Sequence, residues 1–159
     1  MPHGSVMFSH VLHAVATLTE KKIAVKLDYL KKTFRWSDAE VGIAVCSAPS
    51  VLRRSNESLQ RKSGFLISDL GLEPAYIAHC SSMLSHSLEG RLRPRYYAVK
   101  FLKENRFIDH HWSYCTIFKA TEKVFVDKFI CPHKEAAPHL AEDYAAACRG
   151  QVPTRFIVS

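Results

Sequence analysis

The sequence lacks the patterns that mark membrane-spanning segments and several common enzyme sites. No apolar run approaches the roughly 18 residues that a membrane helix needs, so we predict no membrane segment. The six glycines never cluster into a phosphate-binding loop, and the patterns G-x-x-x-x-G-K-[ST], G-x-S-x-G and H-E-x-x-H are absent. We therefore predict no enzyme activity, no catalytic residue and no cofactor.

Paired cysteines are also lacking. The five cysteines are an odd number without C-x-x-C spacing, which favours a reducing compartment and buried thiols over a disulfide framework. A zinc site is the competing interpretation, with His110, His111, Cys115, Cys131 and His133 as its candidate ligands. Their spacing matches no common zinc pattern, in which ligands come in close pairs, so we predict no metal.

The amino terminus lacks a targeting signal. Residues 1–10 are too short for a transit peptide and have none of its Arg-rich amphipathic character. We expect the chain to begin inside a longer protein.

Alternating apolar and polar runs of strand length are lacking as well, except over residues 156–158. What is present is a helix, stop, helix unit over residues 51–77. Ser55 is a helix N-cap candidate, Gly71 suits a left-handed stop, and Pro74 suits the first turn of a second helix. The predicted fold class is all-α.

The same unit recurs along the chain. First-helix caps are predicted at Thr19, Ser55, Ser87 and Thr121, in steps of 36, 32 and 34 residues. Second-helix caps are predicted at Ser37, Glu73 and Asp109. Stacked helix pairs with a period of 20 to 50 residues build an α-solenoid. We predict about four partial or complete repeats over residues 1–150, followed by a tail over residues 151–159.

Apolar residues follow each predicted cap at helical spacing. Four positions after the cap come Ile23, Leu59 and Phe125, and in the third unit either Arg91 or, with a slip of one residue, Leu92. The helix predicted from Ser87 to about Glu104, interrupted by Pro94, has these residues on its apolar side: Leu88, Leu92, Tyr96, Val99 and Leu102.

Positive charge is concentrated in the middle of the chain. Residues 49–106 carry ten Lys or Arg and five Asp or Glu, within a net charge of +7 for the whole chain. Such residues can follow a phosphate backbone. The candidate contacts are Arg53, Arg54, Arg61, Lys62, Arg91, Arg93, Arg95, Lys100 and Lys103. Arg53 and Arg54 are preferred because they precede a helix N-terminus; solvated side chains, or ion pairs to Glu57 or Glu89, are the alternative.

Several stretches resemble the mTERF (mitochondrial transcription termination factor) repeat of land plants, notably FLISDLGLEPAYIA and SLEGRLRPRY. The resemblance spans nearly the whole chain, although Ser81 stands where a proline is usual. It implies a left-handed superhelix whose basic concave side binds nucleic acid in mitochondria or chloroplasts. It also implies a role in organellar transcription or RNA processing.

Two functions from different classes therefore remain open. The first is a nucleic-acid-binding solenoid, with duplex DNA favoured over RNA. The second is a protein-binding helical repeat without direct nucleic-acid contact, which would use the neutral carboxyl-terminal third and the apolar repeat ends. The same exposed repeat ends would allow self-association.

Overall fold

Every regular element in the part of the chain that the structure describes is helical. The computed structural model describes residues 6–109 and 112–157, and no strand occurs in these ranges. The predicted all-α class is confirmed. None of the helices described is long and apolar enough to cross a membrane. The chain divides into two compact units, residues 1–81 and residues 82–159.

The first unit is built on one long helix and several short ones. Its elements are α1 (Val6–Phe34), α2 (Asp38–Ser47), the 3-10 turn η1 (Pro49–Arg53), α3 (Asn56–Ser63), the π-helical segment η2 (Gly64–Asp69) and α4 (Pro74–His79). Helix α2 packs on α4, and α1 packs on α3. Phe34 stacks on Trp36 at a centroid distance of 4.6 Å, and Trp36 Nε1 donates a hydrogen bond to Pro74 O at 2.8 Å. These contacts hold the end of α1 against the start of α4.

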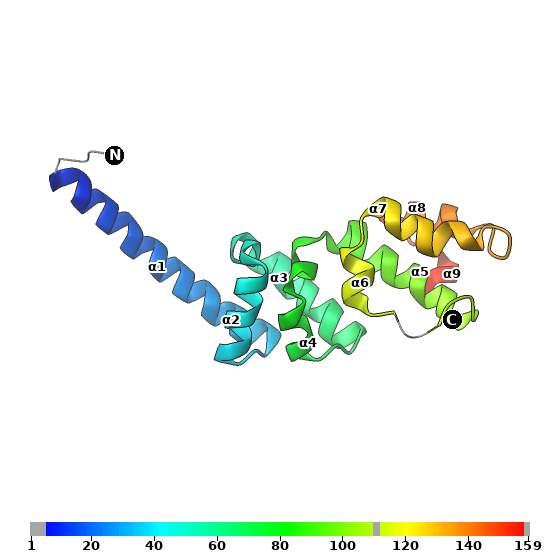
Figure 1. Cartoon of the computed structure of the whole chain (residues 1–159), viewed down its shortest axis with the longest axis horizontal. Coiled ribbons are helices and arrows are strands. Elements are labelled where there is room, and N and C mark those ends of the chain that lie inside the picture. Colours follow the sequence, from blue (N-terminus) through cyan, green and yellow to red (C-terminus); the bar gives the residue numbers. More distant parts are fainter. Residues whose placement is uncertain (1–5, 110–111, 158–159) are drawn as a thin grey trace. The chain divides into compact units, whose positions relative to one another are not determined.

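The second unit is centred on α5. The 3-10 turn η3 (Ser81–Ser85) comes first. The elements after it are η4 (Leu88–Leu92), α5 (Arg93–Glu104), α6 (Tyr114–Lys119), α7 (Glu122–Phe125), η5 (Val126–Ile130), η6 (Cys131–His133), α8 (Leu140–Cys148) and α9 (Thr154–Ile157). Helices α8 and α9 both pack on α5 (Figure 1). Leu92, Val99 and Leu102 of η4 and α5 are fully buried with Phe118 and Phe125.

Three of the four predicted first-helix caps are confirmed. Ser55 Oγ accepts a hydrogen bond from Ser58 N at 3.1 Å, Ser87 Oγ from Gly90 N at 3.0 Å, and Thr121 Oγ1 from Val124 N at 3.2 Å. Each bond satisfies one of the amides that a helix start leaves without an intrahelical partner. The three helices that begin in this way are α3, η4 with α5, and α7 with η5.

The predicted cap at Thr19 is wrong. Helix α1 continues from Val6 to Phe34 without a break (Figure 1), because nothing before Thr19 ends a helix: no glycine or proline lies between Val6 and Phe34. The predicted Met7–Ala16 helix is the first part of this same element. Ile23, predicted to face inward, is 38% exposed.

The second-helix caps are confirmed in part. Ser37 forms the predicted capping box, since its Oγ accepts from Glu40 N and its own amide donates to Glu40 Oε1. Glu73 occupies the N-cap position of α4 without a side-chain bond. The cap at Asp109 is wrong, because α6 begins later and its cap is Ser113.

The one-residue slip after the Ser87 cap occurs in the structure and has a physical cause. The helix that Ser87 caps begins with a π-helical turn, in which Leu92 N donates to Ser87 O at 3.0 Å. This turn holds one residue more than an α-helical turn. Leu92 is therefore fully buried, whereas Arg91 is half-buried. Pro94 follows in the first turn of α5, where a proline is tolerated.

The carboxyl-terminal residues predicted as a tail include a short helix. Over 154–157 the chain is helical, so the strand-like pattern at residues 156–158 does not form a strand in its described part. Phe156 is 3% exposed, and its ring lies 6.4 Å from the ring of Tyr97 and 6.2 Å from that of Phe101. Helix α9 is thus anchored on α5.

Candidate nucleic-acid interface

Basic side chains from two elements meet at the start of α3 in the first unit. Arg53 ends η1 and Arg54 precedes the Ser55 cap. From α1, Lys26 Nζ donates hydrogen bonds to Arg54 O and Asn56 Oδ1. Tyr29, one turn further along α1, donates from its hydroxyl to Asn56 O at 2.8 Å. These bonds place Lys26 beside Arg53 and Arg54. We call these three residues the α3 basic cluster.

Sequence reasoning missed Lys26 as a member of this cluster. Its only local signal is its position four residues after Lys22, which puts the two lysines on one side of α1. That α1 packs beside the start of α3 follows from contacts nearly 30 residues apart in sequence. Periodicity within either helix carries no information on such a contact.

The α3 basic cluster is open to solvent on one side. Arg53 is exposed, and it forms no ion pair with Glu57 or any other carboxylate within the described ranges. Arg54 and Lys26 are half-buried. Burial lowers the pKa of Lys26. An exposed guanidinium next to a helix N-terminus, flanked by two further cations, suits an anionic oxygen of a phosphate.

The two other predicted contacts of the first unit differ in exposure. Arg61 is exposed on α3. Lys62 is only 4% exposed, so its prediction as a surface contact is wrong. Burial, and next the positive charge of Arg54, lower the pKa of Lys62. Lys62 lies between buried residues of the face that α3 turns toward α1, where its aliphatic stem adds to the packing.

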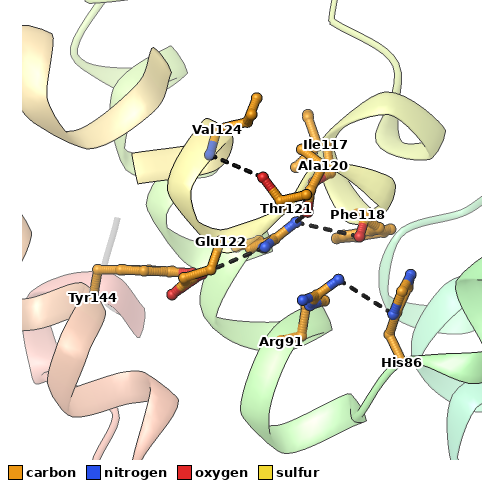
Figure 2. A network of polar contacts seen from close by, with 10 residues as sticks. His86, Arg91, Ile117, Phe118, Ala120, Thr121, Glu122, Val124 and Tyr144 are labelled. Atoms are coloured by element: carbon orange, nitrogen blue, oxygen red, sulfur yellow. Dashed lines mark hydrogen bonds and ion pairs between the residues drawn. The ribbon is translucent and has the colours of Figure 1, made fainter. Parts of the chain in front are cut away.

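Arg95 is the clearest correction among the predicted contacts. Its side chain is fully buried. Its Nη1 donates to three backbone oxygens, those of Ile117 at 2.8 Å, Phe118 at 3.2 Å and Ala120 at 2.7 Å (Figure 2). These carbonyls lie at the carboxyl end of α6, where a helix leaves acceptors without intrahelical donors. Arg95 therefore caps α6 from inside the protein and is unavailable to a phosphate.

A carboxylate and a phenol complete the surroundings of Arg95. Arg95 Nη2 lies 3.4 Å from Glu122 Oε1, which also accepts a hydrogen bond from Tyr144 Oη at 2.6 Å (Figure 2). The guanidinium carbon lies 4.7 Å from the centre of the Phe125 ring. Burial, and next the hydrogen bond to Glu122, raise the pKa of Tyr144 above its ordinary range. The network links α5, α7 and α8.

The four remaining predicted contacts are half-buried, and each has a partner within the second unit. Arg91 Nη1 lies 3.3 Å from His86 Nδ1 (Figure 2). The ion pairs are Arg93 Nε with Glu89 Oε1 at 3.3 Å and Lys100 Nζ with Glu104 Oε1 at 3.7 Å. Lys103 Nζ lies 5.1 Å from the centre of the Tyr114 ring. The predicted alternative of an ion pair to Glu89 thus holds for Arg93.

Three of the five candidate zinc ligands, Cys115, Cys131 and His133, lie within the described residues. His110 and His111 lie outside the described residues; among the others, no group of three His, Cys, Asp or Glu could hold a metal ion. The expectation of buried thiols is wrong for Cys46 and Cys131, which are exposed, while Cys148 is half-buried. Burial raises the pKa of the Cys148 thiol.

Comparison with known proteins gives two matches. The family model described as mTERF matches residues 8–126, which is most of the chain. The Arabidopsis thaliana protein named "Transcription termination factor MTEF18, mitochondrial" is 27% identical over 108 residues, and these are 68% of this chain and 19% of the relative. The chain thus spans about a fifth of that relative's length. No solved structure matches the chain.

Proposed function

Since the chain belongs to the mTERF family, we propose that it binds nucleic acid and regulates gene expression in an organelle. The observation that carries the proposal is the α3 basic cluster, in which Arg53 is exposed without an ion pair in the described ranges. Lys26 and Arg54 lie beside it. Arg61, also exposed, follows on α3. This surface is the one we assign to phosphate contacts.

The finer features of the proposal follow from the family and from the repeated caps. We propose that the helices stack as a left-handed superhelix of mTERF-type repeats, with double-stranded DNA as the preferred ligand and RNA as the alternative. The name of the Arabidopsis relative describes a mitochondrial transcription termination factor. For this chain we propose control of transcription termination or initiation, or of RNA processing, in mitochondria or chloroplasts.

A salt titration tests the proposal. Binding of the full chain to duplex DNA, to single-stranded RNA and to a neutral polymer is measured at increasing salt concentration. We expect affinity for duplex DNA to fall linearly on a log-log plot, because each neutralised phosphate releases counterions. The absence of nucleic-acid binding at low salt would refute the proposal. A stronger and equally salt-dependent binding to RNA would reverse the preference between the two ligands.

Matched double variants locate the contact. Arg53→Ala with Arg54→Ala is expected to lessen the duplex slope by up to about 1.8, at about 0.9 for each lost phosphate contact. Lys123→Ala with Lys134→Ala removes the same charge from two exposed positions of the second unit. This control is expected to keep the slope of the original chain. Equal effects of the two pairs would show that net charge, and not the α3 basic cluster, governs binding.

Protein binding is the second candidate function, and one observation favours it. Ile23 is 38% exposed on α1. Ile23 shares a helix face with Leu27, and Leu27 lines an open groove with Val41 and Val45 of α2. An apolar strip of this kind can dock a partner helix or a second copy of the chain. Sedimentation of Ile23→Ser, compared with the original chain, tests self-association.

A further inference from the structure

An open groove with an aromatic wall lies on the second unit. It is bordered by Trp112, by Lys119 at the end of α6, and by Val124, Lys128 and Phe129 of α7 and η5. All these residues belong to the second unit. Both lysines are exposed, Val124 is 39% exposed and Trp112 is half-buried. The groove shares no residue with the α3 basic cluster.

The indole of Trp112 is held in place at this groove. Its ring meets the ring of Phe129 edge-on, with centroids 5.1 Å apart and planes at 72°. Lys128 Nζ lies 5.6 Å from the centre of the Trp112 ring. The groove therefore has a fixed aromatic surface, with the Lys128 ammonium group over the indole ring. A second ammonium, from Lys119, lines the same groove, and no Asp or Glu is among its described lining residues.

We propose that this groove binds one unpaired base of a single-stranded nucleic acid. The base lies against Trp112 and Val124, and the adjoining phosphates lie at Lys119 and Lys128. Stacking on an aromatic side chain beside a positively charged track is how proteins hold single strands without reading their sequence. The inference rests on the proposed function, because it names a second mode of binding to nucleic acid.

The chemistry of the lining favours a base over an acidic peptide. A bound peptide must pair its backbone N–H and C=O groups, and the lining offers few neutral partners for them. Thr116 carries the one hydroxyl among the described lining residues, and that hydroxyl is 2.9 Å from Ser113 Oγ. A flat apolar surface flanked by two cations matches the π-face of a base and its phosphates.

Tryptophan fluorescence tests this inference in the full chain. The chain contains two tryptophans, and Trp36 is 2% exposed and stacked on Phe34, so added ligand reports on Trp112. Oligouridine of about eight nucleotides, within the site size of single-strand binders, is expected to quench the emission. An abasic phosphodiester of equal length is expected to bind more weakly and to leave the emission unchanged. Trp112→Phe identifies the quenched ring, because it removes the signal while keeping an aromatic surface.

Variants of the lining separate stacking from charge. Trp112→Ala is expected to weaken oligouridine binding about 10- to 100-fold, the usual effect of losing one stacked base. Lys119→Ala with Lys128→Ala is expected to lessen the single-strand salt slope by about 1.4, at about 0.7 for each phosphate. Val124→Glu places a carboxylate in the groove at an exposed position, so it weakens binding even if Trp112→Ala fails to fold.

The outcomes distinguish this inference from the proposed function. If the chain binds duplex DNA with a steep salt slope, but oligouridine leaves Trp112 emission unchanged and Val124→Glu binds normally, only the groove assignment is overturned. The same holds if a polyglutamate peptide quenches Trp112 and oligouridine does not. If no nucleic acid binds at low salt, the proposed function fails and the groove assignment fails with it.

Discussion

Replacing Arg95 offers the sharpest test of how the second unit is held together. In Arg95→Ala, the oxygens of Ile117, Phe118 and Ala120 lose the guanidinium that now donates to all three. These acceptors are backbone atoms, so no second substitution can remove them. The ion pair to Glu122 and the contact with the Phe125 ring are lost as well.

The expected destabilisation is about 3 to 5 kcal/mol, because several buried acceptors lose their donor at once. The lost bonds run from a charged donor, and each buried acceptor left unsatisfied costs about 1 to 3 kcal/mol. Arg95 Nε is itself buried without a hydrogen-bond partner, which offsets part of this loss. Arg95→Met fills more of the space than alanine but leaves the same acceptors unpaired, so it is expected to destabilise nearly as much.

Urea unfolding followed by circular dichroism measures the effect. With an m value of about 2 kcal/mol per molar urea, the midpoint is expected to fall by roughly 1.5 to 2.5 M. Glu122→Gln serves as the control, because the Glu122 side chain is 58% exposed and its ion pair contributes about 1 kcal/mol or less. The reasoning is refuted if Arg95→Ala leaves the midpoint unchanged and instead lessens the salt slope of nucleic-acid binding.

Three further predictions concern a cap, a phenol and a thiol. Ser55→Ala is expected to lower the free energy of unfolding by about 1 kcal/mol. Thr19→Ala, inside α1, is expected to keep the free energy of unfolding or to raise it slightly. The urea midpoints of the two variants measure both effects. The pKa of Tyr144 is raised in the folded state. The contribution of this phenol to stability is therefore complete below the pKa that it has in the unfolded chain, and it falls as the pH rises above that value. Tyr144→Phe should flatten the alkaline loss of stability, and an unchanged profile would contradict this. Iodoacetamide at pH 8 is expected to modify exposed Cys46 before Cys148, because burial raises the Cys148 pKa; mass spectrometry of the labelled peptides measures the order.

Local signals in the sequence predicted those parts of the fold that local chemistry determines. The cap at Ser55 depends on an oxygen and an amide three residues apart, and the box at Ser37 depends on Glu40 at the same spacing. Such contacts need no knowledge of the rest of the chain. Thr19 also carries a hydroxyl at a similar distance from apolar neighbours, but no residue before it ends a helix. A cap requires both the hydroxyl and the end of the preceding element.

The candidate interface was harder to predict, because the same residue type serves opposite purposes. Charge counting treats Arg53 and Arg95 alike, since both lie in the strongly basic middle of the chain. In the structure Arg53 is exposed, whereas Arg95 is fully buried at the end of α6. The carbonyls that hold Arg95 come from residues 22 to 25 positions later. That distance depends on tertiary packing, which composition does not record.

One signal for the burial of Arg95 was nevertheless present in the sequence. Leu88, Leu92, Arg95, Val99 and Leu102 follow one another at spacings of four, three, four and three, and all five are buried. A strict alternation of this kind keeps residues on one helix face. The sequence-based prediction placed Tyr96 on this face and left Arg95 out, yet Tyr96 is half-buried. Position in the row therefore outweighs residue type, and an arginine at such a position needs buried acceptors, which the carboxyl end of α6 supplies.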